Sequence, residues 1–155
     1  MTNHRSHAAP RITAKIAGRP LHPLLRPFAI AYFLAVLGCD LLYANAGANA
    51  RFSAQGFGSV TEWLLVAGLV SAGLCAVVAL VDMMGERRFR DLPDLGLCIA
   101  GGALVLTIEL YNLTLRQAAG NDAILPMGLI LSLSAVAVLL ATPSRSWSRM
   151  YRQAR

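Results

Sequence analysis

The chain has few charged side chains for its length. Of its 155 residues, 14% are charged and 56% are hydrophobic, which leaves too little polar surface to cover a soluble domain of this size. The sequence also lacks a Ser/His/Asp set, an HExxH motif and a phosphate-binding glycine loop. The glycines of Gly96–Gly102 lie in a long apolar run rather than after a strand. We therefore predict a membrane protein that is not an enzyme.

Histidine and cysteine are equally scarce. The three cysteines fall singly in different apolar runs, with neither a CxxC pair nor a histidine at metal-ligand spacing: Cys39, Cys75 and Cys98. The sequence therefore predicts no metal site and no cofactor, and we interpret the cysteines as small packing residues.

Four long apolar runs are present instead, and each is long enough to cross a bilayer as a helix. They are Pro27–Ala46, Thr61–Met84, Leu95–Leu115 and Ala123–Thr142. We predict an all-α, polytopic membrane protein: a four-transmembrane-helix bundle over residues 19–142, with loops at Ala44–Gly58 and Gln117–Asp122. Residues 1–18 are expected to form a disordered basic tail, and residues 143–155 a basic amphipathic tail on the membrane surface.

The positive charge is concentrated on one side of these spans. The net charge is +6, and the loop after the second run, like both tails, is rich in arginine, whereas the other side carries Arg51 and Arg116. The positive-inside rule predicts that both termini and the Glu86–Asp94 loop are cytoplasmic, in a bacterial inner membrane. We expect these arginines to contact anionic lipid rather than nucleic acid, because the chain has no folded reader domain.

A cleaved signal peptide is the alternative for the N-terminus. Ala48-Asn49-Ala50 before Arg51 is typical of a cleavage site. The first apolar run is too long for a signal core and contains Asp40, so we expect it to be retained.

Part of the sequence resembles a known family. The segment Gly18–Leu42, GRPLHPLLRPFAIAYFLAVLGCDLL, joins a GRPLHP motif to an apolar helix containing Asp40, and is followed by Trp63, by LVDMM around Asp82 and by YNLTLR over Tyr111–Arg116. This arrangement, over about Gly18 to Thr142, resembles the predicted membrane proteins of the domain of unknown function 2231 family.

The resemblance implies four transmembrane helices and recurrent polar positions, but no reaction. The positions in this chain are His22, Pro23, Asp40, Asp82, Asn112 and Arg116. Some relatives are joined to Rieske-type iron–sulfur domains, which implies an electron-transfer setting. Relatives often carry a histidine at the start of the third span, where this chain reads Arg90-Asp91-Leu92-Pro93-Asp94. That difference argues against a cofactor held between two histidines.

His22 lies between Pro20 and Pro23, just before the first span. We expect it at the cytoplasmic interface, hydrogen-bonded to a helix end or to Asp82. Haem or quinone binding near His22 is the functional alternative. Haem usually takes two axial ligands, and the other histidines, His4 and His7, belong to the expected disordered tail.

A second polar group lies deeper in the spans. Glu109, Asn112 and Arg116 share one face of the third helix at i, i+3 and i+7, and Asp40 of the first helix reaches a similar depth. We predict one interhelical cluster near the outer leaflet. Because one arginine cannot balance two carboxylates there, one carboxyl group is expected to be protonated or linked to water.

Three functions remain open from the sequence. The first is a structural or accessory membrane subunit that associates with itself or with a membrane partner. The second is a small redox subunit with haem or quinone near His22. The third is a proton-coupled transporter that uses Asp40 and Glu109, for which the chain is short and shows no clear inverted repeat.

Overall fold

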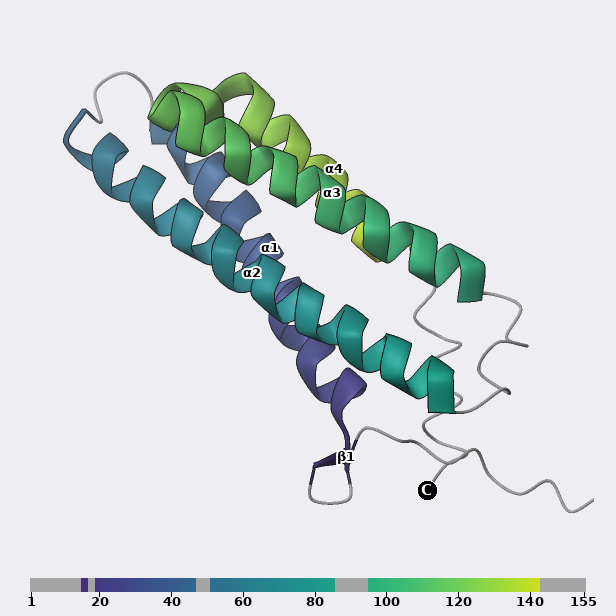
Figure 1. Cartoon of the computed structure of the whole chain (residues 1–155). Coiled ribbons are helices and arrows are strands. Elements are labelled where there is room, and N and C mark those ends of the chain that lie inside the picture. The colour runs from purple at the N-terminus through teal and green to yellow at the C-terminus, as the bar shows by residue number, and fades with distance from the viewer. Residues whose placement is uncertain (1–14, 17–18, 47–50, 86–94, 143–155) are drawn as a thin grey trace, which may run out of the picture.

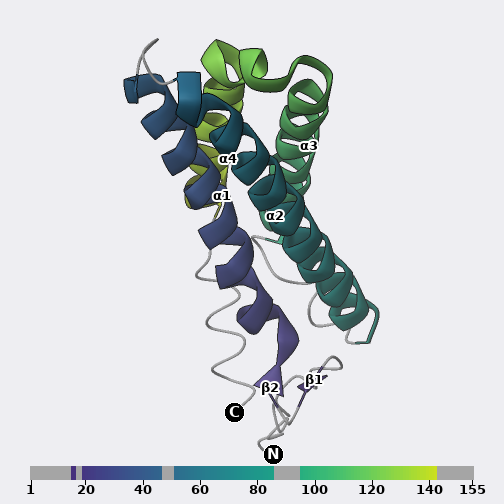
Figure 2. The same cartoon turned by 90° about the vertical axis from the view of Figure 1, so that its left-hand side faces the viewer.

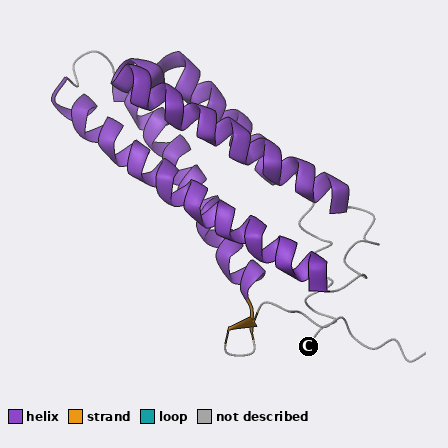
Figure 3. Ribbon diagram, viewed as in Figure 1, coloured by secondary structure: helices purple, strands orange, loops and turns teal. Residues whose placement is uncertain are grey.

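The computed structural model describes residues 15–16, 19–46, 51–85 and 95–142, and these are almost wholly helical (Figures 1 and 3). Four α-helices run side by side: α1 (Leu21–Ala46), α2 (Arg51–Gly85), α3 (Leu95–Ala119) and α4 (Leu129–Ala141). Two strands of two residues each, β1 (Lys15–Ile16) and β2 (Arg19–Pro20), pair antiparallel just before α1. This strand pair was not predicted from the sequence. The expected disorder of residues 1–18 is wrong at Lys15–Ile16, which form β1. The rest of that tail (residues 1–14 and 17–18), the C-terminal tail (143–155) and the loop that follows α2 (86–94) lie outside the described residues.

The first two helices are longer than the apolar runs that predicted them. α1 begins at Leu21, which puts Pro23 in its first turn, where a missing backbone N–H costs nothing. α2 begins at Arg51, so most of the expected loop at Ala44–Gly58 is helical. The sequence has no proline over this stretch, and a formed helix extends with one hydrogen bond for each added residue.

α3 and α4 belong to one apolar segment that folds back on itself. Three described segments are apolar enough to cross a bilayer, and the third, Leu95–Ala141, has 47 residues. It is interrupted by a 3₁₀ turn, η2 (Gly120–Ala123), and a π-helical turn, η3 (Ile124–Gly128), in which Leu125 is extended at φ −124° and ψ 133°. α4 therefore lies beside α3 instead of continuing it (Figure 2).

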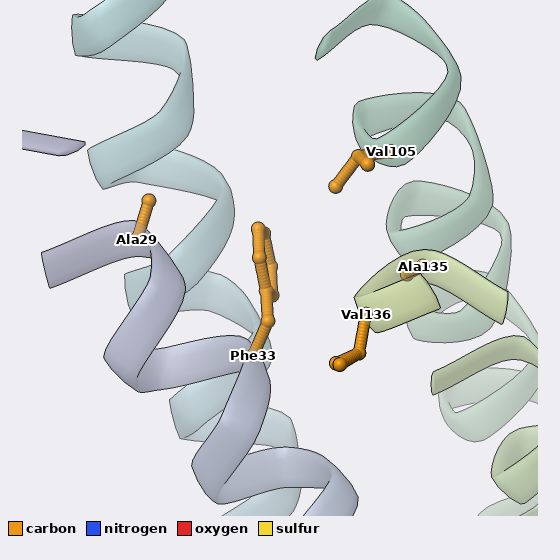
Figure 4. Packing of buried hydrophobic residues seen from close by; sticks show 5 residues of the cluster. All are labelled: Ala29, Phe33, Val105, Ala135 and Val136. Atoms are coloured by element: carbon orange, nitrogen blue, oxygen red, sulfur yellow. The ribbon is translucent and has the colours of Figure 1, made fainter. Parts of the chain in front are cut away.

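The bundle has two distinct ends. At the turn end, α1 leads to α2 and α3 leads to α4; at the open end, α1 and α3 begin while α2 and α4 finish (Figure 1). Between them, Ala29 and Phe33 of α1 pack with Val105 of α3 and with Ala135 and Val136 of α4 (Figure 4). These contacts tie the α3–α4 pair to α1.

α1 and α2 approach closely at Gly68. A Cβ atom built there would lie 2.7 Å from Cε1 of Phe33, which is closer than real carbon atoms come. Only glycine leaves this space, and Phe33 occupies it while remaining fully buried. Close backbone approach through small residues is the usual way in which helices pack inside lipid.

The outward faces of the bundle are strongly apolar. Large hydrophobic side chains are exposed along all four helices, including Met84 (80%), Trp63 (74%) and Leu140 (72%). A continuous apolar exterior of this extent needs a covering, and hydrocarbon is the natural one for helices of this length and composition.

Candidate functional site

Arg116 is the centre of a polar network at the turn end. Its Nη2 atom donates to Oδ2 of Asp40 on α1 at 2.7 Å, which is also an ion pair. Nη1 donates to Oγ1 of Thr61 on α2 at 3.0 Å, and Nε donates to Oδ1 of Asn112 on its own helix, also at 3.0 Å. One guanidinium therefore joins α1, α2 and α3 through its fixed fork of donors.

Asn112 extends the network to the fourth helix. Its Nδ2 group donates to Oε2 of Glu109 at 3.1 Å and to Oγ of Ser132 on α4 at 3.0 Å. Ser132 in turn donates to the same Asp40 oxygen that Arg116 contacts, at 2.7 Å. The network is thus a closed ring through Asp40, Ser132, Asn112 and Arg116, and Thr61 adds a contact from α2.

The network is sealed from its surroundings. The six side chains have exposed fractions of 0 to 2%: Asp40, Thr61, Glu109, Asn112, Arg116 and Ser132. In so dry a setting a charge without a partner is very costly, whereas a paired and hydrogen-bonded charge is tolerated.

Local backbone geometry makes room for the guanidinium. A Cβ atom at Gly128, where η3 passes into α4, would lie 3.1 Å from Nη2 of Arg116 and 2.7 Å from the carbonyl oxygen of Ala123. Glycine at position 128 therefore lets the α3–α4 turn close over Arg116.

Two carboxylate oxygens of the network have no hydrogen-bond partner among the described residues. They are Oδ1 of Asp40 and Oε1 of Glu109. Both carboxyl groups share one arginine, and Asp40 is the one that forms an ion pair with it. Glu109 instead accepts its bond from the neutral amide of Asn112.

The structure brings together the four residues that the sequence analysis grouped: Asp40, Glu109, Asn112 and Arg116. It adds Thr61 and Ser132, which the sequence analysis missed. Hydroxyl residues are abundant in the apolar runs, and Ser71 and Ser134 simply donate to the carbonyl four residues earlier in their own helices. Only the depth of Thr61 and Ser132, level with Arg116, distinguishes them.

His22 and Asp82 form a separate buried group at the open end. Their exposed fractions are 9% and 0%, and the His22 carbonyl lies 3.7 Å from Sγ of Cys75 on α2. Burial lowers the pKa of His22 from 6.5 to about 4; the positive charge of Arg26 acts in the same direction, and the negative charge of Asp82 opposes both. His22 is therefore a neutral imidazole near pH 7. It contributes nothing to the polar network, which lies at the other end.

The described residues contain no group of three or more histidine, cysteine and acidic side chains placed to hold a metal ion. Within the same part of the chain, the polar network and the His22–Asp82 group are the two sites where ionisable side chains are buried together.

Comparison with models of known protein families identifies the family of this chain. A family model described as predicted membrane protein (DUF2231) matches residues 18–146. The chain belongs to this family. The resemblance read from the GRPLHP segment is therefore confirmed, and the DUF2231 match covers the whole described bundle. No similar protein was found among curated sequences or among solved structures. As a DUF2231 member with these apolar helices, the chain is an integral membrane protein.

Proposed function

We propose that this DUF2231 protein is a structural or accessory membrane subunit, without enzymatic activity, in which the polar network fastens four membrane-spanning helices together. One observation carries the proposal: six polar side chains from all four helices are joined by hydrogen bonds, and none is more than 2% exposed. A network so enclosed holds helices together. It offers no open route to a solute.

Four crossings fit the length of the third apolar segment. Forty-seven residues as one straight helix would measure about 70 Å, more than twice the hydrocarbon thickness of about 30 Å. The fold-back at η2 and η3 divides it into two arms. The arginine-rich tails and the Glu86–Asp94 loop then all face the cytoplasm of a bacterial inner membrane, as the positive-inside rule requires.

The decisive test is to remove the centre of the network. Arg116→Met leaves the Asp40 carboxylate buried without its cation, and breaking a buried ion pair costs about 3–5 kcal/mol in soluble proteins. Asn112→Ala removes bonds from a neutral amide, and such bonds in membranes average about 0.6 kcal/mol each. We expect the melting temperature in detergent to fall much further for Arg116→Met than for Asn112→Ala. Equal stability of Arg116→Met and the parent would overturn the proposal.

A proton-conducting site is the second candidate, and the unbonded oxygens of Asp40 and Glu109 favour it. The structural role and the proton-conducting role differ in the proton flux that they predict. For a structural network, proteoliposomes with an imposed pH gradient leak protons no faster than empty liposomes. A flux that Glu109→Gln abolishes without changing the melting temperature would replace the structural role with transport.

Self-association or a membrane partner belongs to the proposed accessory role. Light scattering of the detergent-purified protein, corrected for bound detergent, measures self-association directly. The redox alternative near His22 is tested in the same preparation by a reduced-minus-oxidised spectrum, which we expect to be flat.

A further inference from the structure

A long apolar cavity opens between the helices at the open end. Its volume is about 290 Å³, close to the lower limit of small-molecule sites. On α2 it extends from Ala72 to Met83, a length of about 16 Å at the helical rise of 1.5 Å per residue. Phe33 and Val105, two members of the buried core, line it as well. The cavity is therefore long and lined by all four helices.

Small residues create this space. Ala72, Ala76 and Ala79 line it from α2, and Gly102 lines it from α3. A Cβ atom at Gly102 would meet nothing within 4 Å, so a larger side chain has open space there. The cavity is open on one side to the exterior of the bundle, where Leu80 and Ile99 of its lining are exposed, and hydrocarbon chains are the surrounding solvent of a membrane bundle.

The charged and imidazole groups in the lining lie towards the end where α1 begins. They are His22 and Arg26, and His22 is neutral near pH 7 because its pKa is about 4. Arg26 is half-buried and makes no ion pair with any of the described residues. Lys15 and Arg19 precede α1 on the strand pair. One end of this apolar cavity thus carries a half-buried positive charge.

We propose that this cavity binds one anionic phospholipid of the surrounding bilayer, with an acyl chain between α1, α2 and α3 and the phosphate group against Arg26. The apolar lining suits a hydrocarbon chain, and the arginine cation at its polar end suits an anionic headgroup. Basic pockets between transmembrane helices on the cytoplasmic side are typical sites for such lipids. The site lies at the opposite end from the polar network, so it does not depend on the role proposed for that network.

Native mass spectrometry of the full chain, released from nanodiscs of equal phosphatidylglycerol and phosphatidylcholine, tests the proposal. We expect one phosphatidylglycerol to be retained for each chain, with a preference of about fivefold, the ratio that one arginine–lipid contact supplies. Arg26→Gln should keep the bound lipid and lose the preference. Retention of both lipids in equal amounts by the parent would overturn the headgroup assignment.

Filling the cavity with a larger side chain tests whether an acyl chain occupies it. Gly102→Leu places four carbons in the open space, and we expect it to reduce the retained lipid at least about fivefold, the change that a loss of about 1 kcal/mol produces. Gly96→Leu is the matched control, because Gly96 lies on the same helix, also has open space at its Cβ, and does not line the cavity. Ala76→Leu fills the cavity from α2 and replaces Gly102→Leu if that variant does not fold. Retention at the parent level by folded cavity-filling variants would refute the proposal, as would retention of a neutral isoprenoid in place of phospholipid.

Discussion

Asp40 and Glu109 lie in the same network but have different partners. Asp40 accepts from the Arg116 cation and from Ser132, whereas Glu109 accepts from the Asn112 amide. We therefore expect Glu109→Gln, whose amide oxygen can accept the same bond, to melt within a few degrees of the parent. Asp40→Asn removes the anion that forms the ion pair with Arg116 and should lower the melting temperature clearly. The prediction fails if Glu109→Gln is the less stable of the two.

His22 makes stability depend on pH. Its pKa in the folded protein, about 4, lies below the unfolded value of 6.5, so between these values the unfolded chain binds more protons. The free energy of unfolding is highest above pH 6.5, where His22 is neutral in both the folded and the unfolded chain. It falls as the pH drops from 6.5 towards 4, by about 2 kcal/mol at pH 5. Thermal melts of the parent and of His22→Gln measure this. The parent should lose more stability than the variant between pH 7 and pH 5, and parallel curves would contradict the assignment.

The residues of the network differ in how well the sequence predicts them. Glu109, Asn112 and Arg116 are predictable because helical spacing alone puts them on one face, and a charge inside an apolar run demands a partner such as Asp40. Ser132 and Thr61 are not predictable in this way. A serine or threonine hydroxyl in a helix can donate its hydrogen bond to a carbonyl of the same helix, as Thr107 does to Ala103. The sequence around such a residue therefore does not indicate whether it has a partner on another helix.

At the scale of the helices, Gly68 controls the distance between α1 and α2. A Cβ atom added there would meet the Phe33 ring and would lie 3.2 Å from the Cβ atom of Tyr32. We expect Gly68→Leu to destabilise the bundle, since overpacking typically costs about 1–3 kcal/mol. Gly73→Leu, on the same helix with open space at its Cβ, is the control. Similar melting temperatures for the two variants would show that α1 and α2 are not tightly packed at Gly68.

Helix boundaries were the least predictable part of the fold. Hydropathy located the apolar centre of each helix, because burial in hydrocarbon determines which residues are tolerated there. It gave no information on the less apolar helix ends, such as the start of α2 at Arg51, where helix continuation depends on backbone hydrogen bonds and not on hydropathy. The expected loop at Gln117–Asp122 anticipated only part of η2, and the fourth span expected from Ala123 was wrong at its start, because η3 occupies Ile124–Gly128 and α4 begins at Leu129.

The proposed topology puts all the described helix ends of the open end on one side of the membrane. We expect phosphatase fusions after Gly85 and after Arg155 to be inactive, and a fusion in the 47–50 connection to be active, because the phosphatase needs disulfides that form only in the oxidising compartment. Fluorescent fusions at the same positions give the reciprocal control. An active phosphatase at Arg155 together with an inactive one after Gly85 would mean an odd number of crossings between these two positions.

The apolar stretches of α1 and α2 differ in length, at 22 and 27 residues. At 1.5 Å per residue these lengths are about 33 Å and about 40 Å, yet the polar network pins both helices to the same partners at one end. The shorter helix matches an ordinary hydrocarbon core of about 30 Å, and the longer one exceeds it. Beside α2, this hydrophobic mismatch is absorbed by tilt of the helix or by local thickening of the lipid. Thickening would draw lipids with longer chains to the α2 side, whereas tilt of α2 would leave the bilayer unchanged.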